Sequence, residues 1–320
     1  MTRKPTARGL LVALVASATF GLSGAFAKPL LEAGWSPAAA VTVRALLGAV
    51  VLLPVVLLSL RGRWGALWRA RRRVLVMAFI GVAGCQLAYF ASVQRIAVGT
   101  AILIEYLAPL ALVVWVWARS RRMPQRVVLI GSAVAVAGLV LVLGPGVLGR
   151  IDALGLVFAL IAMIGCAVYY VVAAEDDGDL PPVALAGSGL LLGGTVLGVV
   201  GLTGLVPFTF TTAPVAMFGT VLPIWVPVLV LGVVSSAIAY ATSIVATQLL
   251  GSRLASFVGL LEVVAATLYA WLLLGEQLTI PQLIGGALIL AGIALVRSEK
   301  PADAAVEPGG RARPVPALID

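Results

Sequence analysis

The chain has 320 residues, of which 62% are hydrophobic and only 11% are charged, and its mean hydropathy is +1.13. Soluble globular domains carry about 25% charged residues. This composition therefore excludes a soluble globular protein and indicates one that crosses a lipid bilayer several times. The formal net charge is +9. Because the basic residues border apolar segments, we expect them to face anionic lipid and expect no nucleic-acid partner.

Ten stretches are apolar over the roughly 20 residues that a transmembrane helix needs. In chain order they are about 10–27, 37–60, 74–94, 97–118, 127–144, 153–173, 183–205, 222–246, 254–274 and 281–297. A membrane β-barrel would instead show strands of about ten residues with alternating polarity. The connecting loops are short. The sequence therefore predicts an all-α membrane protein with ten transmembrane helices.

The first stretch has two interpretations. Basic residues near the N-terminus precede an apolar run that ends in Ala-Phe-Ala at 25–27, a pattern shared with cleavable signal peptides. Against cleavage, GLLVALVA at 9–16 resembles GLVFALIA at 155–162. A segment that is removed has no reason to recur deep in the chain, so we expect a retained first helix.

An internal repeat relates the two halves. LIGSAVAVAGLVLV (129–142) aligns without gaps on LIGGALILAGIALV (283–296) with eight of fourteen residues identical, and the same offset of 154 places Trp117 on Trp271. The repeat predicts a first five-helix unit at 1–146 and a second at 147–297. The Pro- and charge-rich composition of 298–320 predicts a disordered cytoplasmic tail. Four glycines are matched by the offset of 154: Gly131 with Gly285, and Gly138 with Gly292. In each copy the two glycines are seven residues apart and lie on one face of their helix, which predicts close helix packing.

An odd number of helices per unit inverts the second copy in the membrane, a plan found in many transporters. If the N-terminus is cytoplasmic, all but four of the 22 Lys and Arg residues fall on the cytoplasmic side, as the positive-inside rule requires. The acidic loop 174–182 also falls inside, but acidic residues contribute little to topology. We therefore expect a multi-pass protein of the plasma membrane with both termini in the cytoplasm.

Two segments carry a family resemblance. RIAVGTAILIEYLAPLALVVW (95–115) and GLLEVVAATLYAWLLLGEQLTIPQLIGGALILAGIAL (259–295) resemble the EamA family of the drug/metabolite transporter superfamily, and the first looks most like its amino-acid-exporter branch. The resemblance covers roughly 9–297 and implies a secondary transporter. The family's ninth helix usually carries Glu-Pro, whereas this chain has Glu262-Val263 there. Pro109 occupies the equivalent place in the first copy, one turn after Glu105.

Charged residues inside the predicted helices are the first candidates for function, because such residues usually face the interior of a bundle. They are Arg44, Glu105 and Glu262. The 154-residue offset places Glu262 on position 108, three residues from Glu105, so both carboxyl groups should face one central cavity. Two carboxylates suit the ammonium of a zwitterionic ligand, and an arginine suits its carboxylate. Purely structural bonds are the alternative for each of the three.

Neighbouring side chains extend the candidate site. Tyr89, Tyr106 and Tyr240 could line the same cavity, although tyrosines within membranes also serve in packing and in interfacial belts. A carboxyl group that loses contact with water favours its neutral form, which makes proton coupling a candidate role for the glutamates. Cys85 and Cys166 fall within spans and are expected to be unpaired, buried thiols.

Other chemistry is poorly represented. The chain has no His, which removes the usual Ser-His and Cys-His pairs and most zinc sites, and it has no GxxxxGK[ST] loop. We therefore expect no enzymatic activity, no cofactor and no metal. The expected function is export of amino acids or related small polar metabolites, with the bilayer as the other partner and a homodimer left open. The alternatives are an exporter of drug-like or lipid amphiphiles and a membrane scaffold or sensor.

Overall fold

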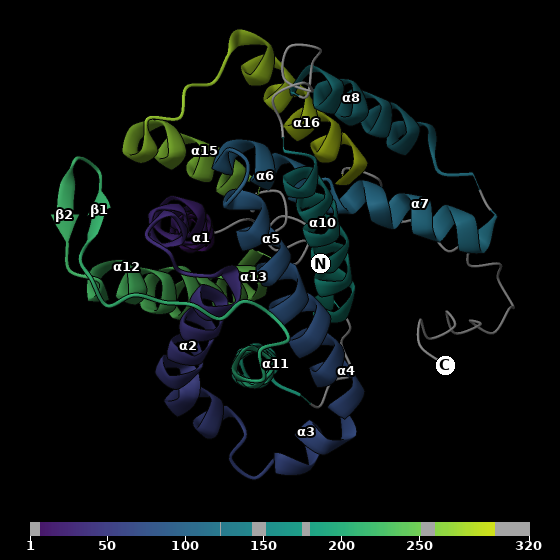
Figure 1. Ribbon diagram of the computed structural model, residues 1–320. Helices are drawn as coiled ribbons and strands as arrows, with labels where there is room; N and C mark the ends of the chain where they lie inside the picture. The colour runs from purple at the N-terminus through teal and green to yellow at the C-terminus, as the bar shows by residue number, and fades with distance from the viewer. Residues whose placement is uncertain (1–6, 122, 143–151, 175–179, 251–259, 298–320) are drawn as a thin grey trace, which may run out of the picture.

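The computed structural model describes residues 7–121, 123–142, 152–174, 180–250 and 260–297, and helices dominate it (Figure 1). In order the elements are α1 (Ala7–Glu32), α2 (Pro37–Ser59), α3 (Trp64–Arg69), α4 (Arg71–Val76), η1 (Met77–Gly84), α5 (Cys85–Val93), α6 (Val98–Glu105), α7 (Ala108–Ser120), α8 (Arg126–Val142), α10 (Ala153–Ala174), α11 (Pro182–Leu202), β1 (Val215–Met217), β2 (Thr220–Leu222), α12 (Trp225–Leu229), η2 (Val230–Ile238), α13 (Ala239–Leu250), α15 (Leu261–Leu274) and α16 (Ile280–Arg297). The predicted tail and the predicted boundary near residue 146 lie outside the described residues.

Among the described residues, seven helical segments are long and apolar enough to cross a membrane. One of them joins α4, η1 and α5, and another joins α12 and η2 with the start of α13. Three further apolar helices, α8, α15 and α16, are shorter. The chain is thus a mostly helical, multi-pass membrane protein, while the count of ten crossings stays a prediction.

Several contacts bring loops together at one end of the bundle. Trp35 Nε1 donates to the carbonyl oxygen of Thr211 at 3.0 Å, and the Thr209 N–H donates to Ser36 Oγ, also at 3.0 Å. Ser36 is also the N-cap of α2, because its side chain accepts the N–H of Ala39. We name this end, formed by residues 33–36, 94–97, 203–224 and 275–279, the hairpin side. The opposite end, with residues 60–63 and 123–125, is the arginine side.

Asp152 shows how α10 begins at the hairpin side. Its Oδ1 accepts the N–H of Gly155 at 2.8 Å, which caps the helix, and its Oδ2 lies 3.2 Å from Nη1 of Arg95. The backbone N–H of Gly155 and then the Arg95 guanidinium hold the pKa of this carboxyl group below its usual range. Since α1 ends and α10 begins at this side, the first helices of the two copies run in opposite directions.

The repeat extends to backbone details. The π-helical segment η1 spans 77–84, and the 154-residue offset carries it to 231–238, within η2. Helix α7 is followed by Arg121 with φ 54°, and the same offset leads to Gly275, which follows α15 with φ 68°. The helix pairs match too: α1 packs on α13 and α15, and α10 packs on their counterparts α5 and α7.

A two-stranded antiparallel hairpin lies in the long connection between α11 and α12, which the sequence analysis leaves unassigned. Phe218 and Gly219 form its turn with φ 53° and 76°, a left-handed pair that suits a tight hairpin. The Phe218 ring meets Phe26 of α1 edge to face at 5.2 Å. The hairpin therefore lies against the end of α1, as Figure 1 also shows. Alternating polarity over three residues per strand is too short a signal to predict it.

The four matched glycines lie where α8 packs against α16. A Cβ atom on Gly131 would lie 2.7 Å from the carbonyl oxygen of Gly292, and one on Gly285 would lie 2.6 Å from that of Gly138. The obstructing atoms belong to backbone and have no rotamer by which to move. The absence of side chains thus allows the last helices of the two copies to touch along their backbones.

We expect Gly285→Ala to destabilise the protein by about 1–3 kcal/mol, the usual cost of overpacking. Gly286→Ala, on the same helix, is the matched control, because its Cβ atom would meet only the Leu103 side chain at 3.6 Å. Thermal unfolding of the two purified variants in one detergent measures the difference. Equal unfolding midpoints would show that α8 and α16 can move apart to accept the added Cβ atom without loss of stability.

Candidate functional site

The fourth apolar stretch is one span in length but is built from two helices, α6 and α7. Pro109 causes the break, because it has no N–H and its ring clashes with the carbonyl group four residues earlier, that of Glu105. The chain turns at Tyr106 and Leu107, where the Leu107 N–H bonds to the carbonyl oxygen of Ile104 at 3.0 Å. Glu105 is thereby the last residue of a half-helix in the middle of the span.

Glu262 lies in the first turn of α15, just after residues 251–259, which the structure does not describe. Its carboxyl group is within hydrogen-bonding reach of the Tyr106 hydroxyl, which comes from the break between α6 and α7. The two predicted glutamates also interact electrostatically with each other. Both side chains are only partly exposed. Each glutamate thus lies at the end of a helical segment: Glu105 ends α6, and Glu262 lies in the first turn of α15, the counterpart of α7.

Arg44 is buried, with 4% of its surface exposed, and it forms four hydrogen bonds to neutral groups. These bonds run from Nη1 to Ser23 Oγ at 2.7 Å and to Gln86 Oε1 at 2.8 Å, from Nε to Ser236 Oγ at 3.1 Å, and from Nη2 to the carbonyl oxygen of Ser235 at 3.1 Å. Its guanidinium also lies 5.3 Å from the centre of the Phe90 ring. Within the described residues, four of its five N–H groups have an acceptor, and one on Nη2 has none.

Arg44 makes no ion pair within the described part of the chain, since no carboxylate oxygen there lies within 4.0 Å of it. It interacts with Glu105 and Glu262 electrostatically over a longer distance, and also with Tyr89 and Tyr240. The structure therefore gathers the predicted residues into one cluster, which we name the central cluster. Its members are Arg44, Tyr89, Glu105, Tyr106, Tyr240 and Glu262.

Small residues let η2 approach α2 and reach Arg44. Gly48 follows Arg44 by one turn, and a Cβ atom there would lie 2.8 Å from the Cβ atom of Ser236. The hydroxyl of Ser236 donates to the carbonyl oxygen of Leu231, five residues earlier, at 2.9 Å. That spacing belongs to a π-helical turn, a feature that often occurs at functional sites.

Cys85 contacts Glu105 directly: its Sγ lies 3.4 Å from Glu105 Oε1 and 3.4 Å from the carbonyl oxygen of Ala162. Both cysteines are buried and neither forms a disulfide, as predicted, but the sequence predicts no role for Cys85 beside the glutamate. A signal for this contact does exist in the sequence. Residue 95 lies in the turn between two antiparallel helices, and positions 85 and 105 are each ten residues from it. The two side chains are therefore expected at the same depth in the bilayer.

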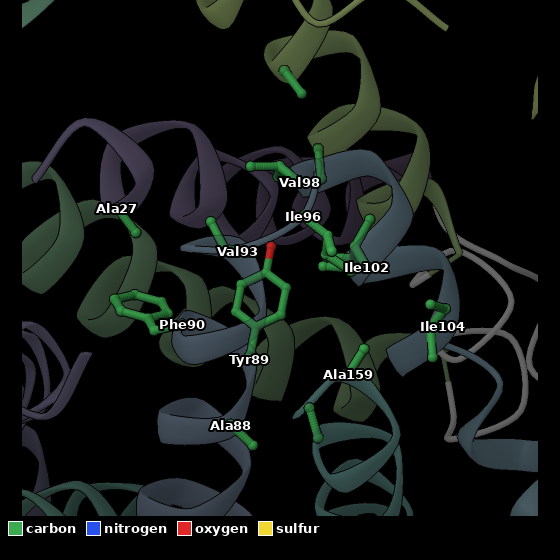
Figure 2. Packing of buried hydrophobic residues seen from close by; sticks show 14 of the residues in the cluster. Ala27, Ala88, Tyr89, Phe90, Val93, Ile96, Val98, Ile102, Ile104 and Ala159 are labelled. Atoms are coloured by element: carbon green, nitrogen blue, oxygen red, sulfur yellow. The ribbon is translucent and has the colours of Figure 1, made fainter. Parts of the chain in front are cut away.

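The three predicted tyrosines are buried, each with at most 6% of its surface exposed. The Tyr240 ring packs edge to face on Phe20 at 5.1 Å. The Tyr89 hydroxyl has no hydrogen-bond partner among the described residues. Figure 2 shows its ring beside Phe90 and Val93, with the hydroxyl directed toward Val98. An unpaired buried hydroxyl is costly, so this one is a candidate for contact with a transported molecule or water.

Known proteins resemble the chain over most of its length. The model of the EamA-like transporter family matches residues 7–144 and again residues 153–298. The chain belongs to the EamA-like transporter family. The two matched stretches of this EamA protein are separated between α8 and α10.

Individual relatives agree with this assignment. An uncharacterized transporter of Archaeoglobus fulgidus is 29% identical over 214 residues, which cover 66% of this chain and 71% of the relative. The uncharacterized inner membrane transporter YicL of Salmonella typhimurium is 22% identical over 297 residues, which cover 91% and 95%. A crystal structure of another protein has the same fold, with a TM-score of 0.60 at 19% identity, covering 90% of this chain and 97% of that one. The EamA protein is therefore a membrane transporter, and these findings point away from an enzyme.

Proposed function

We propose that this EamA protein is a secondary active transporter that exports amino acids or related small polar metabolites across the plasma membrane. Transport would proceed by alternating access between the two five-helix copies, with the arginine side and both termini in the cytoplasm. The observation that carries the proposal is the broken span, which holds Glu105 at its break, beside Glu262 and Arg44, in an otherwise apolar bundle.

Broken helices in transporters often surround the place where substrate and coupling ion bind. The two carboxyl groups have few partners: the described contacts of Glu105 are one thiol, and those of Glu262 are one hydroxyl within reach. A substrate ammonium would supply the missing positive charge. Among the described residues Arg44 bonds only to neutral groups and has one N–H on Nη2 without an acceptor, which it can donate to a substrate carboxylate.

Proton coupling follows from the same two carboxyl groups. In an apolar site a neutral carboxylic acid is far less costly than an unpaired carboxylate. Binding of a proton and binding of an ammonium are therefore alternative ways to neutralise the site. If the two compete, a proton entering from one side displaces the substrate toward that side, which gives antiport.

Two other functions remain candidates. Export of drug-like or lipid amphiphiles would use the apolar and aromatic surroundings of the central cluster, such as the Phe20 and Tyr240 rings. In a membrane scaffold or sensor, the buried charges would serve structure alone. The names of the two related transporters specify no substrate.

Reconstitution into proteoliposomes separates these functions. With a proton gradient, we expect labelled amino acids to accumulate, and without it we expect only exchange against unlabelled amino acid inside. Empty liposomes are the control. Accumulation of a hydrophobic cationic dye without amino-acid exchange would favour the amphiphile exporter, and no movement of either compound would favour the scaffold.

A further inference from the structure

Outside the central cluster, a charged contact joins the two copies at the hairpin side. Nζ of Lys28 on α1 lies 2.6 Å from Oε1 of Glu276, the second residue after α15. The same oxygen accepts the N–H of Val98, the first residue of α6, at 3.1 Å. The two charged side chains are 22% and 14% exposed. One carboxylate therefore connects α1 and α6 of the first copy with the second copy.

We infer that Lys28 and Glu276 form a latch that closes the hairpin side and must open once in each transport cycle. Glu276 is directed toward α1 and α6 by the turn at Gly275, whose φ of 68° reverses the chain after α15. The Glu276 N–H then bonds to the carbonyl oxygen of Ala270 at 3.1 Å. This turn ends the helix in the left-handed conformation that glycine adopts at low cost.

The latch lies at the hairpin side, next to the central cluster. Gly24 and Lys28 are one turn apart on the same face of α1. A Cβ atom on Gly24 would lie 2.7 Å from the Tyr89 hydroxyl. The Tyr89 hydroxyl of the central cluster is thus about one helical turn from the latch along α1. Two residues before Lys28, Phe26 meets Phe218 of the hairpin, so two independent contacts hold this end of α1.

The arginine side has no equivalent pair in its sequence. The 154-residue offset that relates Gly275 to Arg121 relates Glu276 to Arg122, a residue of opposite charge. For the first helices the offset is 146, which relates Lys28 to Ala174. A latch on one side alone lets the protein favour closure at the hairpin side until the ion pair separates. The inference rests on the proposed function only in requiring an alternating cycle.

Cysteine labelling in nanodiscs tests the latch without any substrate. Thr100, two residues into α6 from Val98, is buried with 4% of its surface exposed, and Thr100→Cys is the reporter. Glu276→Gln removes the charge but keeps an acceptor for the Val98 N–H, and Lys28→Gln removes the other charge. Each variant turns a hydrogen bond between two opposite charges into a weaker one with a single charge, so we expect each to speed labelling by a hydrophilic thiol reagent about tenfold.

Three controls make the labelling result decisive. Glu32→Gln removes an exposed carboxylate one turn after Lys28 and should label at the parental rate, as should Lys28→Arg, which keeps the pair. Every labelled variant also carries Cys85→Ala and Cys166→Ala, so that Thr100→Cys supplies the one thiol, and an unchanged thermal unfolding midpoint excludes a loosening of the whole bundle. Parental labelling rates in both charge-removing variants, or equally fast labelling in Glu32→Gln, would overturn the latch.

A cross-link tests whether the latch has to open. Lys28→Cys with Glu276→Cys, joined by a short bifunctional thiol reagent that is itself cleavable, should lose amino-acid exchange and regain it after cleavage. Exchange at the uncross-linked rate would show that this end stays closed throughout the cycle. If no variant transports any amino acid, the proposed function fails, while the labelling rates still decide whether the pair closes this side.

Discussion

Glu105→Gln is expected to fold and to accumulate in the membrane like the parent protein, yet to lose gradient-driven transport to the level of empty liposomes. The amide keeps the shape of the side chain and an oxygen that can accept from Cys85, but it cannot ionise. The backbone at this position is set by Pro109, so the break between α6 and α7 should persist. The variant therefore removes the charge and leaves the packing.

Counterflow exchange shows what the charge does. If Glu105 serves only in proton coupling, Glu105→Gln should still exchange labelled for unlabelled amino acid without a gradient. If the carboxylate binds the substrate ammonium, exchange should be lost as well. Cys85→Ala is the control for the lost thiol contact and should retain transport. Gradient-driven transport by Glu105→Gln at the parental rate would mean that the glutamate is present for structure alone.

Arg44→Ala should have the largest effect on stability, about 3–5 kcal/mol, because it leaves buried acceptors on three neighbouring segments without a donor. Those acceptors belong to Ser23, Gln86 and the Ser235–Ser236 pair. Arg44→Lys should recover only part of the loss, since an ammonium does not reproduce the planar fork of a guanidinium. Unfolding of the purified variants in detergent, followed by tryptophan fluorescence, measures these differences.

Arg95→Ala is the matched control for Arg44→Ala. Its partner Asp152 is exposed, and exposed ion pairs contribute little, so the unfolding midpoint should stay at the parental value. Combining Arg44→Ala with Glu105→Gln should bring no recovery, because no carboxylate pairs with Arg44 within the described residues. Recovery in that double variant would instead reveal a direct dependence of the arginine on Glu105.

The sequence predicted much of the central cluster, because an ionisable residue in an apolar helix needs no neighbour to be recognised. The cost of a charge in the bilayer singles out Arg44, Glu105 and Glu262 by position alone. The break at Glu105 is similarly local, since Pro109 removes a hydrogen bond to a group four residues away. The internal repeat predicted that the two glutamates lie on equivalent transmembrane spans of the two copies.

The partners of those charges depend on helix packing, which no local pattern encodes. Arg44 and Ser236 are 192 residues apart in the chain, and serines on apolar helices are too common to single out. Likewise, a latch between Lys28 and Glu276 requires α1 and α15 to meet, and their spacing of 248 residues carries no periodic signal. The sequence alone therefore determined the apolar helices, their repetition and the few charges that must face inward. Only the tertiary structure decided which groups satisfy each charge, because a buried hydrogen bond depends on distances of a few ångströms between helices that are remote in the chain.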